Sequence, residues 1–119
     1  MSDGFTSIIR FEITDGQTDA FIALAKKCAE AVSADEPGVS RYSWYVDGNN
    51  CLIHEDYDSS EAFIDHLRGP VGKDLLPQVL EIAKMKAVTV MGTPNEKAEK
   101  VLDSWGALKL GAPAAEIRR

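Results

Sequence analysis

The chain has 119 residues, 45% of them hydrophobic and 27% charged, a balance typical of one globular domain over residues 1–119. Its 19 acidic and 13 basic residues give a formal net charge of -6, and the scattered cations form no stripe that would bind a phosphate backbone, so nucleic acid is a poor candidate partner. The sequence lacks both a secretory signal and an apolar stretch long enough to cross a membrane, so we expect a cytoplasmic protein with no membrane partner.

The first half of the chain predicts three strands and a helix. Residues 7–13 alternate apolar and polar side chains, as a half-buried strand does. Apolar residues at helical spacing follow over residues 17–33 and predict a helix with one buried stripe. Residues 39–46 and 51–57 are rich in β-branched and aromatic residues, and the turn-forming residues 47–50 between them predict an antiparallel hairpin.

A broken helical layer is predicted after the hairpin. Asp58 is expected to cap a short helix that runs to about Leu67, with Glu61 placed to complete a capping box. The Gly-Pro pair at residues 69–70 interrupts this helix, and residues 73–82 predict a second helical piece.

The last predicted elements are a strand over residues 85–91 and a further helix. Residues 93–96 combine a cap at Thr93, a proline at the first helical position and a glutamate at the third, and Gly106 ends the helix. Residues 107–119 have no clear periodicity, so we expect a tail that is ordered only if something docks it.

This order of elements, β-α-β-β-α-β with an extra C-terminal helix, predicts an α+β ferredoxin-like fold. In that fold the helices cover one face of an antiparallel sheet, and Ile8 and Arg10 of the first strand would lie on the other face. A second copy of the chain is the simplest cover for this mixed surface. We therefore predict a two-fold homodimer in which the two sheets face each other.

Several short motifs, in this order and spacing, resemble the antibiotic biosynthesis monooxygenase family of the dimeric α+β barrel group. The resemblance extends from Ser7 to Trp105. The matching residues are Glu36-Pro37-Gly38 before Arg41-Tyr42, the strand end Glu55-Asp56-Tyr57, and the helix Glu61-Ala62-Phe63 reaching His66-Leu67.

The resemblance implies a barrel built across the dimer, with an apolar cavity in each subunit between sheet and helices. It further implies a cofactor-independent monooxygenase that oxidises a quinol-like or polycyclic aromatic substrate with O2 and needs no bound cofactor. The alternative is a non-catalytic dimeric protein of the same fold that binds a small aromatic or apolar ligand or serves in a stress response. A structural role built on the C-terminal helix and tail is a third, weaker hypothesis.

His66 is the first candidate for catalysis, because histidine can accept a proton near neutral pH. It follows Ala62 by four residues and Phe63 by three, so it lies on the buried side of its predicted helix. The alternative is a core or helix-end histidine bonded to a backbone carbonyl.

Tyr42 and Trp44 share one side of their strand and could sandwich a planar substrate, with the hydroxyl or the indole N–H as a hydrogen-bond donor. The alternative is that this aromatic pair belongs to the core or to an interface. Tyr57, Phe63 and Leu76 are the further candidates for substrate contact.

His54 and Asp56 project from the same side of one strand. They could form a catalytic histidine oriented by a carboxylate, but we favour polar contacts across the dimer. A metal site made of His54, Asp56 and His66 is conceivable, yet nothing in the sequence brings His66 to the other two, so no metal is predicted.

Cys28 and Cys51 lack C-x-x-C spacing and are interpreted as small core residues.

Two further expectations complete the site. Glu55 is expected to pair with Arg10 or Arg41 rather than to act as a base. Haem-degrading relatives of the fold use an Asn, Trp and His set, and the resemblance puts Leu76 at the place of that histidine and Tyr57 at the place of that tryptophan. Haem binding by that mode is therefore disfavoured.

Overall fold

The computed structural model describes residues 3–119. The elements in chain order are β1 (Phe5–Ile13), α1 (Thr18–Asp35), β2 (Val39–Asp47), β3 (Asn50–Tyr57), α2 (Ser60–Arg68), the π-helix η1 (Val71–Leu75), α3 (Leu76–Ile82), β4 (Ala83–Gly92), α4 (Glu96–Ser104) and β5 (Leu108–Lys109). The predicted ferredoxin-like order of strands and helices is confirmed.

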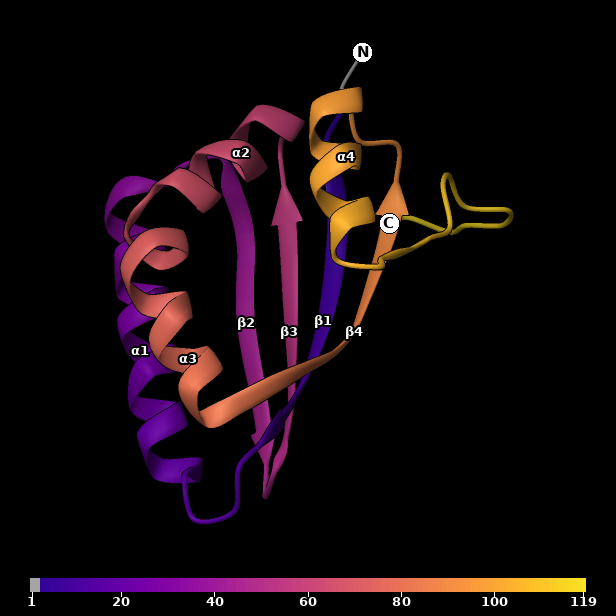
Figure 1. Cartoon of the computed structure of the whole chain (residues 1–119). Helices are drawn as coiled ribbons and strands as arrows, with labels where there is room; N and C mark the ends of the chain where they lie inside the picture. The colour runs from indigo at the N-terminus through magenta and orange to yellow at the C-terminus, as the bar shows by residue number, and fades with distance from the viewer. Residues whose placement is uncertain (1–2) are drawn as a thin grey trace.

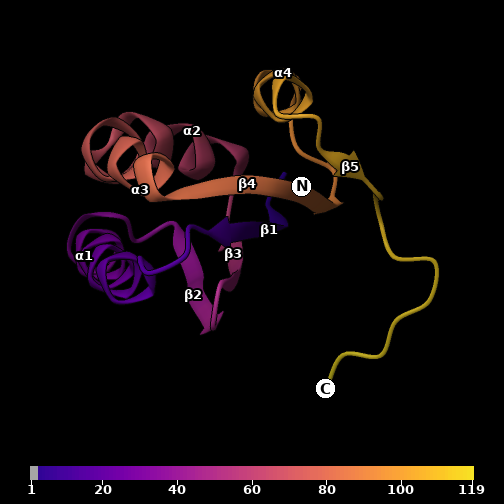
Figure 2. The ribbon, with the colours of Figure 1, turned by 60° about the horizontal axis from the view of Figure 1, so that its bottom comes forward.

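The strands form one sheet in the order β2-β3-β1-β4-β5 (Figures 1 and 2). β1 lies between β3 and β4 and pairs antiparallel with both, and β2 pairs antiparallel with β3 as the predicted hairpin. β5 pairs parallel with β4 and makes the sheet mixed.

α1, α2 and α3 lie on one side of the sheet, which we call the inner face (Figures 1 and 2). The buried side chains of β1 on this face include Ile9, Phe11 and Ile13, the apolar set of the predicted alternation. They pack with Phe21 of α1 and Phe63 of α2 in the main hydrophobic core. Alternate residues of β1 are thus directed toward the helices.

Both predicted helix caps are wrong by one or two residues. The N-cap of α2 is Ser59, whose hydroxyl accepts a hydrogen bond from the Ala62 N–H. Asp58 still belongs to the hairpin end, because its own N–H donates to the Gly38 carbonyl. The N-cap of α4 is Asn95 rather than Thr93, since its side chain accepts from the Ala98 N–H.

The interrupted helical layer begins earlier than predicted. η1 starts at Val71, directly after Pro70, and passes into α3 at Leu76 without a break. A Cβ on Gly72 would lie 2.0 Å from the backbone oxygen of Leu67, so only glycine lets η1 approach the end of α2 so closely. A π-helical turn of this kind often lies next to a functional site.

The C-terminal segment contributes a strand that the sequence did not predict. Leu108 and Lys109 pair with β4, and a single bridge between Gly111 and Gly92 follows. Beyond it the chain extends away from the domain, on the side of the sheet opposite α1 (Figures 1 and 2).

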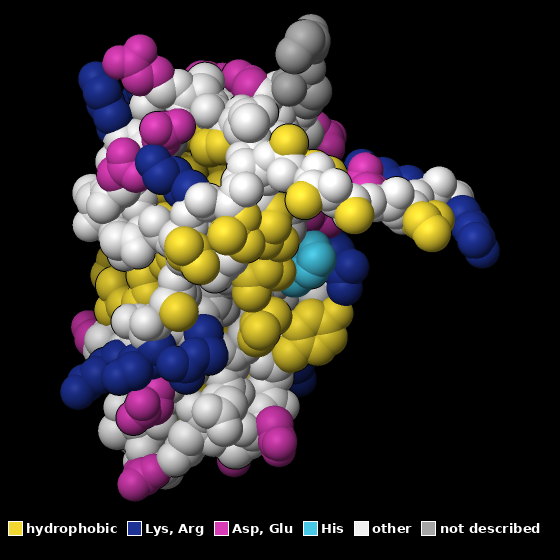
Figure 3. All heavy atoms as spheres, turned by 90° about the vertical axis from the view of Figure 1, so that its right-hand side faces the viewer, with side chains coloured by type: hydrophobic (Ala, Val, Ile, Leu, Met, Phe, Trp, Pro, Cys, Tyr) yellow, Lys and Arg dark blue, Asp and Glu magenta, His cyan; other side chains and the backbone are white. Residues whose placement is uncertain are grey.

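None of the helices within residues 3–119 covers the second side of the sheet, which we call the outer face. Two of its large apolar side chains are exposed, Tyr45 at 53% and Leu52 at 38%. From the side, apolar side chains gather beside a partly exposed histidine and the projecting tail (Figure 3). An uncovered face of this kind agrees with the predicted dimer, which stays a prediction.

Candidate functional site

A largely enclosed cavity lies between the inner face of the sheet and the helices, and its volume is about 40 Å³. It has room for about three water molecules. Six of the seven predicted site residues line it, namely Tyr42, Trp44, Tyr57, Phe63, His66 and Leu76. Glu55 and Cys28, which were not predicted for the site, line it as well.

His66 lies on the buried side of α2, and only 5% of it is exposed. Its ring contacts two tyrosines of the sheet, with the Tyr42 ring centroid at 5.4 Å and the Tyr57 ring centroid at 5.9 Å. The spacing to Ala62 and Phe63 thus predicted its direction correctly. His66 reaches the cavity because α2 packs directly on β2 and β3.

The buried partner of His66 is Glu36, which the sequence did not identify. The distance between His66 Nδ1 and Glu36 Oε1 is 2.6 Å, and both side chains are more than nine-tenths buried. Glu36 directly follows α1, where its backbone N–H bonds to the Val32 carbonyl. A Cβ on Gly38 would lie 2.7 Å from the Ala62 Cβ, so the Glu36-Pro37-Gly38 turn packs tightly on α2 and brings Glu36 to the histidine.

This contact fixes which nitrogen of His66 is available. A separation of 2.6 Å requires a proton between the two atoms, and because an ionised carboxylate can only accept, we assign that proton to Nδ1, which donates to Glu36. Nε2 is then the ring nitrogen left to accept a proton. The alternative in which a backbone carbonyl holds the histidine is therefore not the arrangement found.

Glu55 is a second buried acid in the site, with 4% of it exposed. The Ser7 hydroxyl donates to its Oε1 at 2.7 Å and the Tyr57 hydroxyl donates to the same oxygen at 2.9 Å. Burial raises the pKa of the Glu55 carboxyl, against the opposite effects of His66 and of these two hydrogen bonds.

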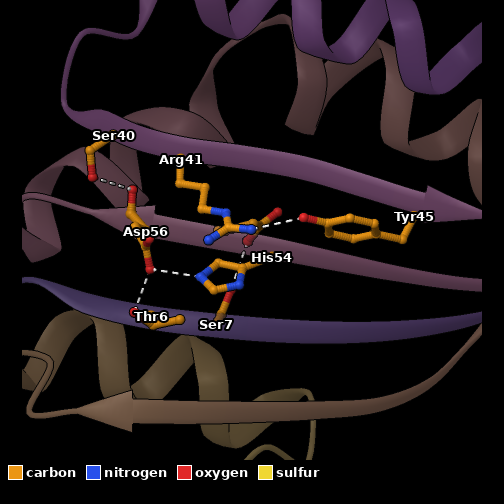
Figure 4. Close-up of polar contacts among 8 residues, drawn as sticks. Thr6, Ser7, Ser40, Arg41, Tyr45, His54 and Asp56 are labelled. Carbon is orange, nitrogen blue, oxygen red and sulfur yellow. Dashed lines mark hydrogen bonds and ion pairs between the residues drawn. The ribbon is translucent and has the colours of Figure 1, made fainter. Parts of the chain in front are cut away.

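The predicted pairing of Glu55 with Arg10 or Arg41 is wrong. Glu55 lies on the inner face between Ile53 and Tyr57, which are also buried. Arg10 is paired in register with Leu52 on the outer face, and the Arg41 guanidinium donates to the Tyr45 hydroxyl at 2.8 Å (Figure 4). Strand alternation puts both arginines on the opposite side of the sheet from Glu55.

The aromatic wall of the cavity contains hydrogen-bond donors. Burial is the main cause that raises the pKa of the Tyr42 and Tyr57 hydroxyls well above the usual value, so both stay protonated at neutral pH. Burial also raises the pKa of the Cys28 thiol to about 11. The Trp44 indole nitrogen is buried and has no hydrogen-bond acceptor among residues 3–119.

His54, the seventh predicted residue, lies on the outer face and does not line the cavity. Its Nε2 is 3.1 Å from Asp56 Oδ1, and the Thr6 hydroxyl donates to the same oxygen at 2.5 Å (Figure 4). His54 and Asp56 thus share one side as predicted. The sheet separates them from His66, so the conceivable metal site of these three residues does not form, and residues 3–119 contain no other group of three such ligands.

The fold defines the class of this protein: it is an α+β protein with a ferredoxin-like sheet and a small cavity between the inner face of that sheet and its helices. A model of the antibiotic biosynthesis monooxygenase family matches residues 4–76, which is more than half of the chain. The chain belongs to this family, as the resemblance predicted. No helix within residues 3–119 is long and apolar enough to span a membrane.

Solved structures of several bacterial proteins are similar to this one. MupZ from Pseudomonas fluorescens has 21% identity and a TM-score of 0.82, over 98% of this chain and 96% of that one. Rv0793 from Mycobacterium tuberculosis has 26% identity and a TM-score of 0.66, over 78% and 97%. A variant of SnoaB, a cofactor-independent oxygenase from Streptomyces nogalater, has 16% identity and a TM-score of 0.63, over 75% and 91%. Among curated proteins, none matches the chain significantly.

Proposed function

We propose that this chain is a cofactor-independent monooxygenase that oxidises a quinol-like or polycyclic aromatic phenol with O2 in the enclosed cavity. The observation that carries the proposal is the 2.6 Å contact between Glu36 and His66, which leaves Nε2 as a base in an aromatic-walled cavity. Membership of a family described as monooxygenases supports the same reaction class.

The proposed reaction begins when His66 Nε2 takes the phenol proton. The buried Trp44 N–H, which lacks a partner within residues 3–119, would then donate to the phenolate oxygen. The electron-rich ring passes one electron to O2, and the two radicals combine at the hydrogen-bearing ring carbon para to the oxygen. The resulting peroxide takes the phenol proton back from His66 and becomes a hydroperoxide, so His66 is again neutral. Loss of water from the hydroperoxide gives a quinone. One atom of O2 becomes a carbonyl oxygen, and the other leaves as water, so the substrate loses its O–H hydrogen and the hydrogen of the para carbon.

The size of the cavity limits how a substrate can enter. A cavity that binds benzene has a volume of about 150 Å³. The 40 Å³ available here accepts O2 but not an aromatic ring. Leu76 of α3, Met85 of β4 and Trp105 at the end of α4 line the cavity and are only partly buried. We propose that these side chains move apart to admit the substrate.

The test is oxygen uptake by pure, metal-free protein given dihydroxynaphthalene-type substrates. We expect uptake above the buffer rate, and a loss of about 10²–10⁴-fold in kcat for His66→Ala. His54→Ala is the matched control, because this histidine lies on the outer face, and it should keep the wild-type rate. Uptake no faster than buffer, or equal uptake in wild type and His66→Ala, would remove the proposal.

A second candidate function is a non-catalytic protein that binds a small apolar ligand in the same cavity. The small volume and the largely apolar wall favour it. A binding protein would be stabilised by such a ligand against thermal unfolding without consuming oxygen. Oxygen uptake and thermal unfolding, measured with the same compounds, separate the two candidates.

We also propose that the chain forms a two-fold dimer through the outer face. The exposed Tyr45 and Leu52 support this arrangement, because an uncovered apolar sheet surface is rarely left in water.

A further inference from the structure

The cavity contains one buried acid that a base-only mechanism does not use. We propose that Glu55 is a further catalytic residue, the proton donor to the oxygen atom that leaves as water, and that Glu36 is the positioning residue for His66. This inference rests on the proposed oxygenation and adds the group that protonates the departing oxygen atom.

The hydrogen bonds of Glu55 determine where its proton lies. Ser7 and Tyr57 both donate to Oε1, so they occupy both lone pairs of that oxygen. A proton on the carboxyl group therefore resides on Oε2. Because Glu55 lines the cavity, a substrate in the cavity is within reach of this side chain.

The charges around the cavity favour a neutral Glu55. The groups that act on it are His66 of α2, Glu36 after α1, and Tyr57 of its own strand, while Tyr42 of β2 and Cys28 of α1 lie beside them. Glu36 already places one negative charge beside His66, at 2.6 Å from its Nδ1, and this charge disfavours a second carboxylate at Glu55. A second buried carboxylate would have no balancing charge of its own, so the neutral acid has the lower free energy.

The proton donor acts when a hydroperoxide at the ring carbon breaks down to the carbonyl. His66 removes the proton from that carbon, and the electrons of the C–H bond form the new C=O bond. The O–O bond breaks with its electron pair on the outer oxygen, and that oxygen takes the Glu55 proton and leaves as water. His66 ends protonated and Glu55 ionised, and return of one proton from His66 to Glu55 restores the site.

The experiment combines infrared spectroscopy with oxygen uptake in the full chain. At neutral pH we expect a carbonyl band of a protonated carboxyl group that disappears in Glu55→Gln and remains in Glu36→Gln. Glutamine keeps the volume and the hydrogen-bond acceptor for Ser7 and Tyr57 but cannot release a proton. We expect Glu55→Gln to lower kcat by about 10²-fold with little change in KM. Glu61→Gln, an exposed site on α2, is the matched control.

The possible results separate this inference from the proposed function. A wild-type protein without the protonated-carboxyl band contradicts the inference whatever the oxygen uptake. Wild-type uptake that is undiminished in Glu55→Gln contradicts the inference and leaves the oxygenase proposal standing. Absence of uptake from the wild type removes both, and the infrared band then still reports whether the carboxyl is neutral.

Discussion

At the scale of single residues, the site depends on two buried acids with different surroundings. Glu36 bonds to a histidine ring nitrogen, whereas Glu55 receives only hydroxyl donors at Oε1. Titratable groups whose surroundings differ in this way often divide the roles of base and acid between them. His66 and Glu55 are such a pair, and both line one cavity.

The buried carboxyl of Glu55 predicts a specific dependence of stability on pH. Its ordinary pKa is 4.5, and burial raises the pKa in the folded state. As the pH rises above 4.5, the unfolded chain loses this proton while the folded chain keeps it, so the contribution of Glu55 to the free energy of unfolding falls. We expect Glu55→Gln to gain stability relative to the wild type as the pH rises from 4 to 8.

Urea unfolding of both proteins across that pH range measures the effect, and their difference cancels the titration of groups common to both. Glu61→Gln at an exposed position should run parallel to the wild type. A constant difference between wild type and Glu55→Gln would show that the carboxyl is not held neutral by the fold.

The sequence predicted part of this site and missed part of it. Helical spacing directed His66 inward, and strand alternation put Tyr42 and Trp44 on one side of their strand. Glu36 was noticed only as part of a turn motif, because its partner lies 30 residues away and sequence spacing gives no distance between separate elements. Glu55 was assigned an arginine partner because acids are seldom buried. However, Ile53 and Tyr57, two residues before and after it in β3, are both buried, and strand alternation puts Glu55 on the same inner face.

At the scale of elements, Ser60 connects three separate parts of the chain. It is fully buried, and its hydroxyl donates to the Asp3 carbonyl at 2.6 Å and accepts from the Asn95 N–H at 2.9 Å. Because Asn95 caps α4, this hydroxyl fixes the start of α4 against the start of α2. α4 in turn leads to Trp105, which lines the cavity and contacts the Phe63 ring.

We expect Ser60→Ala to lower the free energy of unfolding by about 1–3 kcal/mol, because it leaves a backbone N–H and a carbonyl without their partner. Ser104→Ala is the matched control, since that hydroxyl is exposed and bonds only within α4. Urea unfolding at one pH compares the three proteins. Equal losses in the two variants would contradict the role assigned to Ser60.

Element order could be predicted because each strand and helix has its own hydrophobic period. The exact caps could not, because Asp58 and Ser59, or Thr93 and Asn95, are all good cap residues and tertiary hydrogen bonds decide between them. η1 depends on the close approach of Gly72 to Leu67, which only the packed structure reveals. β5 has two residues, too few for any period.

At the scale of the whole molecule, the outer face predicts the oligomeric state. We expect a dimer by size-exclusion chromatography with light scattering, and dissociation in Tyr45→Glu, because a charge would be buried where the two sheets meet. Leu80→Glu on α3 is the matched control, since Leu80 is similarly exposed but lies away from the sheet. A monomeric wild type, or a Tyr45→Glu variant that remains dimeric, would contradict the arrangement.

Oxygenation with His66 as base can be measured by mass spectrometry of the product that metal-free protein forms under ¹⁸O2 from a dihydroxynaphthalene-type substrate. If His66 is the base, the wild type forms a quinone with one labelled oxygen atom from O2, and His66→Ala forms almost none. A product without label, or equal labelled product from His66→Ala and wild type, would contradict it.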